Sequence, residues 1–316
     1  MEKVSQIPGA STPPHSPQTS KSVCYPVAKR IFEQLGGISY QVALCAAVVV
    51  IVPLELLAAV VVTVLIAAAI IIASPWFLFS NSKHKTNALH NAQAVIRELF
   101  ATAVITAMYP FELTSRNDYS PTKKTPMIFV HGYLHNSSGW RVMVNRLKAA
   151  GIDNPMFFIN LGSPLQLMEQ YNESLEKEVA KIMDTTGASQ VIWVGHSMGG
   201  LLGASYVQKH KEKVKTLITI GSPLEGTKMA VLGFGRCSNQ MKNGSDYIKK
   251  LKATPHETPS LCFWSKQDAA IFPRWSAKGP KTPQTNSQLL DKHGHLSMFF
   301  SRKLCNQLIA HLQQQK

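Results

Sequence analysis

The sequence predicts an α/β domain with a mostly parallel, doubly wound sheet that helices cover on both faces. A long apolar segment of transmembrane type precedes this domain. From about residue 110 onward, short apolar runs alternate with helical stretches. Buried strands that alternate with helices are typical of a parallel sheet covered on both sides. The stretch from Gln34 to Ser82 contains Glu55 as its one charged residue, and a run of this length is typical of a transmembrane segment.

Composition and charge narrow the class of protein. The chain has 316 residues, of which 45% are hydrophobic and 16% charged, so it is neither disordered nor collagen-like. Its 33 Lys and Arg against 18 acidic residues give a net charge of +15, which favours anionic partners such as acidic lipid head groups. Nucleic acid is a poor candidate, because the basic residues lack interleaved aromatics and no recognition helix is visible. The five cysteines are scattered without a C-x-x-C pair, which argues against a zinc ribbon or a disulfide framework.

Two segments at the start of the chain differ sharply in composition. Residues 1–33, rich in Ser, Pro, Thr and Gln, are predicted to be a disordered tail. Residues 34–82 are predicted to be a transmembrane hydrophobic segment, which Pro53 and Glu55 divide into two uncharged lobes. Basic residues flank both ends, and a hairpin would place all of them on the cytoplasmic side, so we favour a hairpin over one tilted helix. The bilobed hydropathy is weakly similar to that of the inclusion membrane proteins of chlamydiae.

Residues 83–109 are predicted to form an amphipathic helix or linker. One apolar face at helical spacing consists of Leu89, Ala92, Ile96, Leu99 and Ala103. His90, Arg97 and Glu98 are expected to point away from this face. The helix could lie on the membrane interface or pack on the domain that follows, and we favour packing on the domain.

Residues 110–316 carry the elements of the α/β domain. The predicted strands are 127–130, 156–159, 191–194, 216–220 and 260–264. The predicted helices are 139–150, 165–186, 198–210 and 240–252. No internal repeat interrupts this alternation, which indicates one doubly wound sheet.

The main chemical signal is the pentapeptide Gly195-His-Ser-Met-Gly199, which directly follows the third predicted strand. A sharp turn from strand to helix would hold Ser197 in a strained conformation and present its hydroxyl at the carboxyl edge of the sheet. The two glycines remove Cβ atoms that would clash in such a turn, and the helix N-terminus supplies free N–H groups. A G-x-S-x-G pattern alone arises by chance, but this strand–turn–helix context favours a nucleophilic serine.

A second turn predicts the groups that would stabilise a developing oxyanion. His131-Gly132-Tyr133 follows the first predicted strand, at the same edge of the sheet. The backbone N–H groups of Tyr133 and Met198 would then converge on the oxygen of an attacked carbonyl.

A nucleophilic serine needs a general base, and the base needs an acid that orients it. Asp268 lies on the loop after the last predicted strand, and His295 lies further along the chain. The chain order Ser, Asp, His is the order that this architecture requires. His293 remains an alternative base, whereas Asp246 and Asp291 are poorer candidates for the acid.

Over residues 125–312 the chain resembles the bacterial lipase and esterase branch of the α/β-hydrolase superfamily. The matching stretches are Ile128–Tyr133, Val194–Gly200, Ile220–Thr227 and Gly294–Ser297. The resemblance implies a nucleophilic Ser197, a triad completed by Asp268 and His295, and oxyanion amides on Tyr133 and Met198. It also implies a small cap within residues 223–258. The chain departs from the family at Leu224, where a histidine is common, and shows no clear calcium-binding cluster.

These features together predict a membrane-anchored serine hydrolase that cleaves carboxylic esters of lipids through an acyl-enzyme, without a cofactor or metal. The catalytic domain is expected in the cytoplasm, and the sequence does not indicate an oligomeric state. From Lys228 to Lys281 there are ten basic residues against three acidic ones, which would attract an anionic membrane surface or the phosphates of a CoA ester. The alternatives are an acyltransferase or acyl-CoA thioesterase with the same triad, and a non-catalytic membrane interaction protein.

Overall fold

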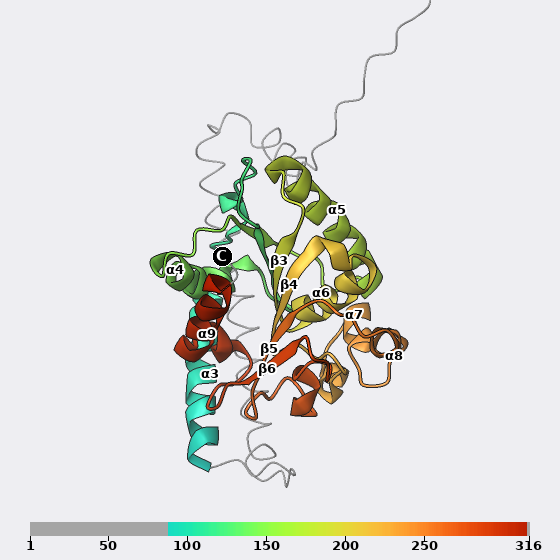
Figure 1. Ribbon diagram of the computed structural model, residues 1–316. Helices are drawn as coiled ribbons and strands as arrows, with labels where there is room; N and C mark the ends of the chain where they lie inside the picture. Colours follow the sequence, from blue (N-terminus) through green and yellow to red (C-terminus); the bar gives the residue numbers. More distant parts are fainter. Residues whose placement is uncertain (1–87, 315–316) are drawn as a thin grey trace, which may run out of the picture. The chain divides into compact units, whose positions relative to one another are not determined.

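A parallel six-stranded sheet forms the centre of the computed structural model, which describes residues 88–314 (Figure 1). The strand order is β2-β1-β3-β4-β5-β6, and each neighbouring pair is parallel. The strands are β1 Met127–Val130, β2 Met156–Ile159, β3 Val191–His196, β4 Val214–Ile220, β5 Ser260–Trp264 and β6 Thr285–Leu289. Because all strands run in the same direction, their carboxyl ends meet at one edge, where the loops that follow them can assemble a site.

The strands consist of apolar residues because both faces of the sheet are covered. Every residue of β1, β2, β3 and β5 is buried. Successive side chains point to opposite faces, so Phe129 and Ile128 belong to different apolar clusters on the two sides of the sheet.

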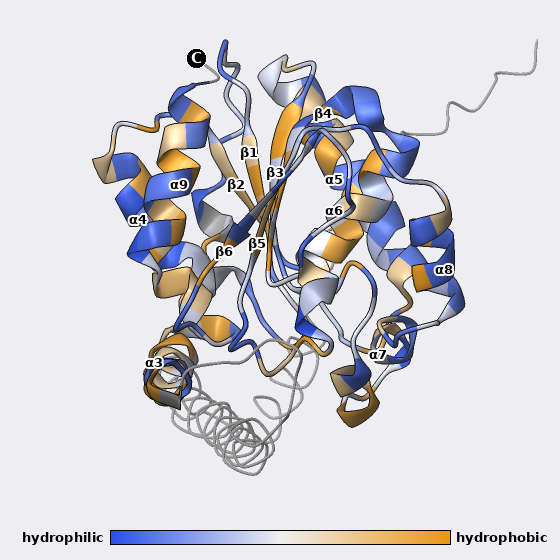
Figure 2. Ribbon diagram, turned by 60° about the horizontal axis from the view of Figure 1, so that its bottom comes forward, coloured by the Kyte–Doolittle hydropathy of each residue, from blue (hydrophilic) through white to orange (hydrophobic). Residues whose placement is uncertain are grey.

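Helices cover the two faces in separate layers. The layer containing α4 Arg141–Ala149 and α9 Arg302–Gln313 lies on one face, and α5 Met168–Thr186 and α6 Met198–Lys209 lie on the other (Figure 2). Between β4 and β5 the chain forms the 3₁₀ helix Lys228–Leu232 and the short helices α7 Arg236–Gln240 and α8 Asp246–Ala253. This insertion occupies the predicted cap segment.

The predicted doubly wound parallel sheet is confirmed, and the differences are local. All five predicted strands form, with β3 and β4 slightly longer than expected. The predicted helix 240–252 is divided between α7 and α8. The sequence did not predict β6, because it is a partly exposed edge strand of polar residues, Thr-Asn-Ser-Gln-Leu. Helix α9 was also missed, although Leu304, Leu308 and Leu312 form a buried stripe at four-residue spacing.

The predicted disordered tail and the transmembrane hairpin at 34–82 lie outside the described residues. Within residues 88–314, the structure has no helix with both the length and the apolar character needed to cross a bilayer.

Helix α3, Ala88–Met108, packs on the domain with a different face from the predicted one. Leu89 and Ile96 are 62% and 68% exposed, whereas Glu98 is 7% exposed, so the expectation that Glu98 points away is wrong. The buried face consists of Asn91, Ala94, Glu98, Ala101, Thr102 and Ile105. Burying a carboxylate is unfavourable unless its oxygens find hydrogen-bond donors, and those of Glu98 find them in the domain.

Candidate active site

Ser197 occupies the sharp turn between β3 and α6. Its backbone has φ 53° and ψ −121°, a conformation that residues other than glycine rarely adopt. A Cβ atom at Gly195 would lie 2.4 Å from the nitrogen of Gly200, and one at Gly199 would lie 2.2 Å from the carbonyl oxygen of Val130. The glycines of the motif are therefore required by close backbone approaches, and the turn presents the serine at the carboxyl edge of the sheet.

His295 and Asp268 form a hydrogen-bonded pair beside this turn. The Nδ1–H of His295 donates to Asp268 Oδ2 at 2.8 Å. The other carboxylate oxygen, Oδ1, accepts from the amides of Ala270 at 2.9 Å and Ile271 at 3.2 Å. Because a carboxylate accepts the Nδ1 proton, the neutral imidazole keeps Nε2 as a proton acceptor.

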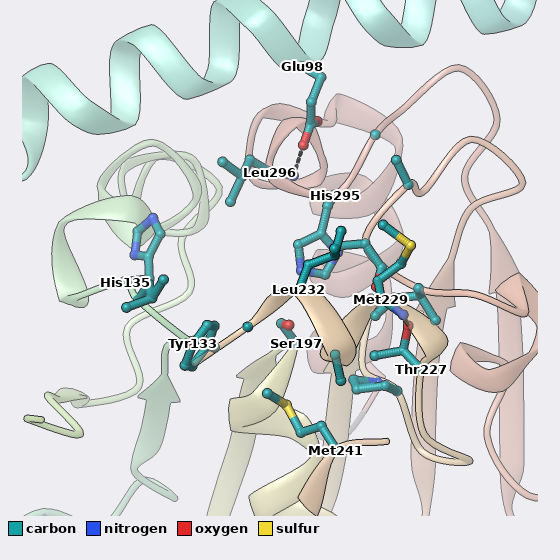
Figure 3. Close-up of a pocket in the computed structure, with 18 of the residues that line it drawn as sticks. Glu98, Tyr133, His135, Ser197, Thr227, Met229, Leu232, Met241, His295 and Leu296 are labelled. Atoms are coloured by element: carbon teal, nitrogen blue, oxygen red, sulfur yellow. Dashed lines mark hydrogen bonds between the residues drawn. The ribbon is translucent and has the colours of Figure 1, made fainter. Parts of the chain in front are cut away.

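Ser197 and His295 line one pocket of about 380 Å³. Figure 3 shows the imidazole and the serine hydroxyl facing the same cavity. The walls are mostly apolar, with Leu134, Met229 and Leu232 among the lining residues, and none of the described residues that line it is Lys or Arg. The pocket therefore favours an uncharged apolar group.

The predicted oxyanion segment lies against the serine. A Cβ atom at Gly132 would lie 2.9 Å from the Cβ of Ser197. Tyr133 lines the pocket, and Met198 is the first residue of α6, directly after the serine. The backbones of Tyr133 and Met198 thus flank Ser197 from two different strand ends.

The side chain of Tyr133 also holds the cap segment. Its hydroxyl donates to the carbonyl oxygen of Phe234 at 2.6 Å and accepts from the Phe234 amide at 2.9 Å. Leu232, two residues earlier, lines the pocket and is 73% exposed. Tyr133 thus connects the oxyanion segment to the cap segment that carries Leu232.

The electrostatic surroundings of His295 favour its protonated form. Burial alone would lower its pKa, but the charge of Asp268, the hydrogen bond that His295 donates to Asp268 and the charge of Glu98 outweigh burial and raise the pKa above the ordinary value. His196 contacts His295 with ring centroids 4.6 Å apart, and its Nε2–H donates to the His295 carbonyl oxygen at 3.2 Å. Burial lowers the pKa of His196 well below its usual range, so this neighbour stays neutral.

The structure separates the alternative residues from this site. The Nδ1–H of His293 donates to the carbonyl oxygen of Asp291 at 2.7 Å, so this histidine is held by its own loop. Asp246 lies in the first turn of α8, where its side chain is 88% exposed and pairs with Lys249. Neither His293 nor Asp246 belongs to the pocket lining.

Glu98 is the site residue that the sequence reasoning missed. Its carboxylate oxygens accept from the amides of the two residues that follow His295, Leu296 at 2.7 Å and Ser297 at 2.9 Å. Figure 3 shows the bond to Leu296. Glu98 also lines the pocket. The contact joins positions 198 and 199 residues apart, so helical periodicity could not have revealed it.

No metal site accompanies these groups in the part of the chain that the structure describes, because no three His, Cys, Asp or Glu side chains between residues 88 and 314 are grouped so that they could hold an ion.

The parallel sheet, with its serine turn between β3 and α6 and its Asp–His pair after β5 and β6, defines an α/β-hydrolase fold. Residues 125–241 match the family model of the α/β hydrolase fold.

Curated relatives and solved structures are similar to parts of the chain. A pimeloyl-[acyl-carrier protein] methyl ester esterase of Yersinia enterocolitica is 30% identical over 102 residues, 30% of this chain and 36% of that protein. A (lyso)-N-acylphosphatidylethanolamine lipase of Mus musculus is 34% identical over 118 residues, 34% of each chain. These matches span about a third of each relative. The mature lipase BlEst2 of Bacillus licheniformis has a TM-score of 0.48 at 20% identity, covering 62% of this chain and 96% of its own.

Proposed function

We propose that the protein is a membrane-anchored serine hydrolase that cleaves carboxylic esters of lipids. The hydrogen bond of 2.8 Å between Asp268 and His295, beside Ser197 in one apolar pocket, is the observation that carries this proposal. The matched α/β hydrolase fold and the esterase and lipase relatives support the reaction class.

The reaction follows from the geometry of these side chains. Ser197 Oγ attacks the ester carbonyl while His295 Nε2 takes its proton, and Asp268 stabilises the resulting imidazolium. The amides of Tyr133 and Met198 stabilise the oxyanion. The alcohol leaves with the proton from His295, and water, activated by the same histidine, then releases the acid from Ser197.

The pocket supports an apolar acyl group as its occupant. Its lining contains no Lys or Arg among the described residues, so an anionic head group would find no cationic partner there and would remain outside the pocket. The apolar rim residue Leu232 and the outward residues Ile96 and Phe100 of α3 are more than 60% exposed. Exposed apolar groups of this kind are typical of surfaces that contact a membrane or a partner.

In this proposal the segment 34–82 anchors the chain and the catalytic domain lies in the cytoplasm. The positive-inside distribution of the flanking basic residues supports this topology. Protease treatment of sealed, cytoplasm-side-out vesicles should digest the C-terminal domain, and protection of that domain would contradict the proposed placement.

The reaction is tested with the full chain in detergent micelles, with and without anionic lipid. Hydrolysis of p-nitrophenyl esters from acetyl to palmitoyl should fall by roughly four to six orders of magnitude in Ser197→Ala. An activity that rises with acyl length in the wild type supports a lipid esterase. Equal inertness of folded wild type and variant, together with no labelling of Ser197 by a fluorophosphonate, would overturn the proposal.

A further inference from the structure

The segment that follows His295 is held by a carboxylate from outside the matched family region. Leu296 and Ser297 begin the 3₁₀ helix Leu296–Phe300, and their amides donate to Glu98 Oε1 and Oε2. The first N–H groups of a helix lack partners within the helix. Burial raises the pKa of Glu98, and the two N–H groups that its carboxylate oxygens accept partly oppose this rise.

The histidine loop is also held by side chains of the loop that carries Asp268. The Ser265 hydroxyl donates to the carbonyl oxygen of His293 at 2.6 Å, and the Lys292 amide donates to Gln267 Oε1 at 3.1 Å. Ser265 and Gln267 belong to the loop that also carries Asp268. The loop that carries His295 is therefore held by two neighbours. One is the loop that carries Asp268, and the other is Glu98 on α3.

Gly294 shows how closely Glu98 approaches this loop. A Cβ atom at Gly294 would lie 2.4 Å from Glu98 Oε2 and 3.1 Å from its Cβ. The backbone beside His295 can therefore accept the carboxylate at its present position because residue 294 has no side chain.

We infer that Glu98 is a positioning residue for His295, holding the backbone after the imidazole and placing a second negative charge beside it. This inference rests on the proposed function, since it assigns His295 as the base. It gives α3, a helix before the matched hydrolase region, a role in the reaction rather than in packing alone.

The charges around His295 give this role a measurable signature. The groups that face it are Asp268 after β5, Glu98 on α3, His196 at the end of β3 and His135 after β1. Both histidines have a lowered pKa because of burial and stay neutral, so the two carboxylates set the field at the imidazole. Burial opposes them, but the charges of Asp268 and Glu98 raise the pKa of His295.

The test measures the rate at which a fluorophosphonate labels Ser197 in the full chain, as a function of pH. In this step Ser197 Oγ bonds to phosphorus, fluoride leaves and His295 takes the serine proton. In Glu98→Gln the amide offers N–H groups where one backbone amide needs an acceptor, and the charge is lost. We expect a labelling rate about tenfold lower at pH 8. The acid limb of the pH–rate profile, where the rate falls as His295 becomes protonated, should move to lower pH because the pKa of His295 falls.

Arg97→Gln is the matched control on the same helix and loop. Arg97 is exposed and donates to the carbonyl oxygen of Lys292 at 3.1 Å, away from the amides after His295. This variant should label at the wild-type rate with the wild-type acid limb.

Gly294→Ala is a second route to the same effect, because its Cβ displaces the Glu98 carboxylate. It should move the acid limb in the same direction as Glu98→Gln, and the double variant should add little to either single change. If Glu98→Gln does not accumulate as folded protein, the acid limb of Gly294→Ala alone tests the inference. If the acid limb does not move in these variants, the inference is overturned, whatever the labelling rate. If the wild type itself is not labelled, the proposed function is refuted instead.

Discussion

At the scale of single residues, the site depends on close approaches that glycine permits. A Cβ at Gly200 would lie 2.1 Å from Ser222 Oγ, in addition to the contacts at Gly195 and Gly199. Between these glycines Ser197 is held in a backbone conformation that costs roughly 1–3 kcal/mol. The surrounding backbone therefore fixes the serine before a substrate arrives, which is the preorganisation that nucleophilic catalysis needs.

The hydrogen bond between Asp268 and His295 leads to a prediction at this scale. In Asp268→Asn the remaining oxygen can still accept from the Ala270 and Ile271 amides, so the loop should keep its fold. The new NH₂ group would face Nδ1 and stabilise the tautomer whose Nε2 carries the proton. We expect initial rates of p-nitrophenyl ester hydrolysis by the full chain to fall by roughly 10⁴-fold.

Asp246→Asn serves as the control for this substitution, because Asp246 is an exposed aspartate at the start of α8. Its hydrolysis rate should match that of the wild type. A rate for Asp268→Asn within tenfold of the wild type would show that His295 does not depend on this carboxylate.

At the scale of secondary-structure elements, α3 joins two different surfaces. Its inner face carries Glu98 to the histidine loop, and its outer face presents Ile96 and Phe100. Ala94 and Val95 also line the pocket. The helix is thus both a wall of the site and a carrier of exposed apolar side chains next to it.

The elements that the sequence predicted follow a local rule. Helix α9 also has a local apolar stripe and was nevertheless missed, whereas β6 and the orientation of α3 depend on distant partners. The strands through β5 follow from continuous apolar runs, and Ser197 follows from its glycines and from a helix that begins one residue later. These signals lie within a few residues of one another. They are enough to predict the sheet and the loops at its carboxyl edge, where Asp268 and His295 lie.

The orientation of α3 could not be predicted in this way. Its apolar periodicity indicated that Leu89 and Ile96 pack inward, but the domain instead buries Glu98, because two amides nearly 200 residues away satisfy its carboxylate. Edge strand β6 was missed for a related reason, since pairing with β5 stabilises a polar sequence that has little apolar character of its own.

At the scale of the whole domain, three histidines lie near the site, two in the loop after β1 and one at the end of β3. His131 follows β1 and its Nε2 accepts from the Leu161 amide at 2.9 Å, while His135 and His196 lie near His295. Burial lowers the pKa of His131 to about 4 and also lowers the pKa of His135 and His196. The folded domain therefore needs these three rings neutral, whereas an unfolded chain would protonate them near pH 6.5.

This difference predicts acid-induced loss of stability. Between pH 6.5 and about 4 the unfolded state binds more protons at the three histidines, so the free energy of unfolding falls as the pH falls. Glu98, whose pKa burial raises, acts in the opposite direction but with one proton against three. His295 has a raised pKa, so its contribution to the free energy of unfolding is lost as the pH rises through that pKa, above the acidic range in which the three histidines titrate.

The shift at His131 from 6.5 to about 4 alone corresponds to about 3 kcal/mol. Near-ultraviolet circular dichroism of the full chain should show a midpoint of thermal unfolding that falls steadily from pH 6.5 to 4.5. His131→Gln keeps an acceptor for the Leu161 amide but does not titrate, so its midpoint should fall less over the same range. If the two proteins lose stability in parallel, His131 is not held neutral by the fold, and the protons that destabilise the domain bind elsewhere.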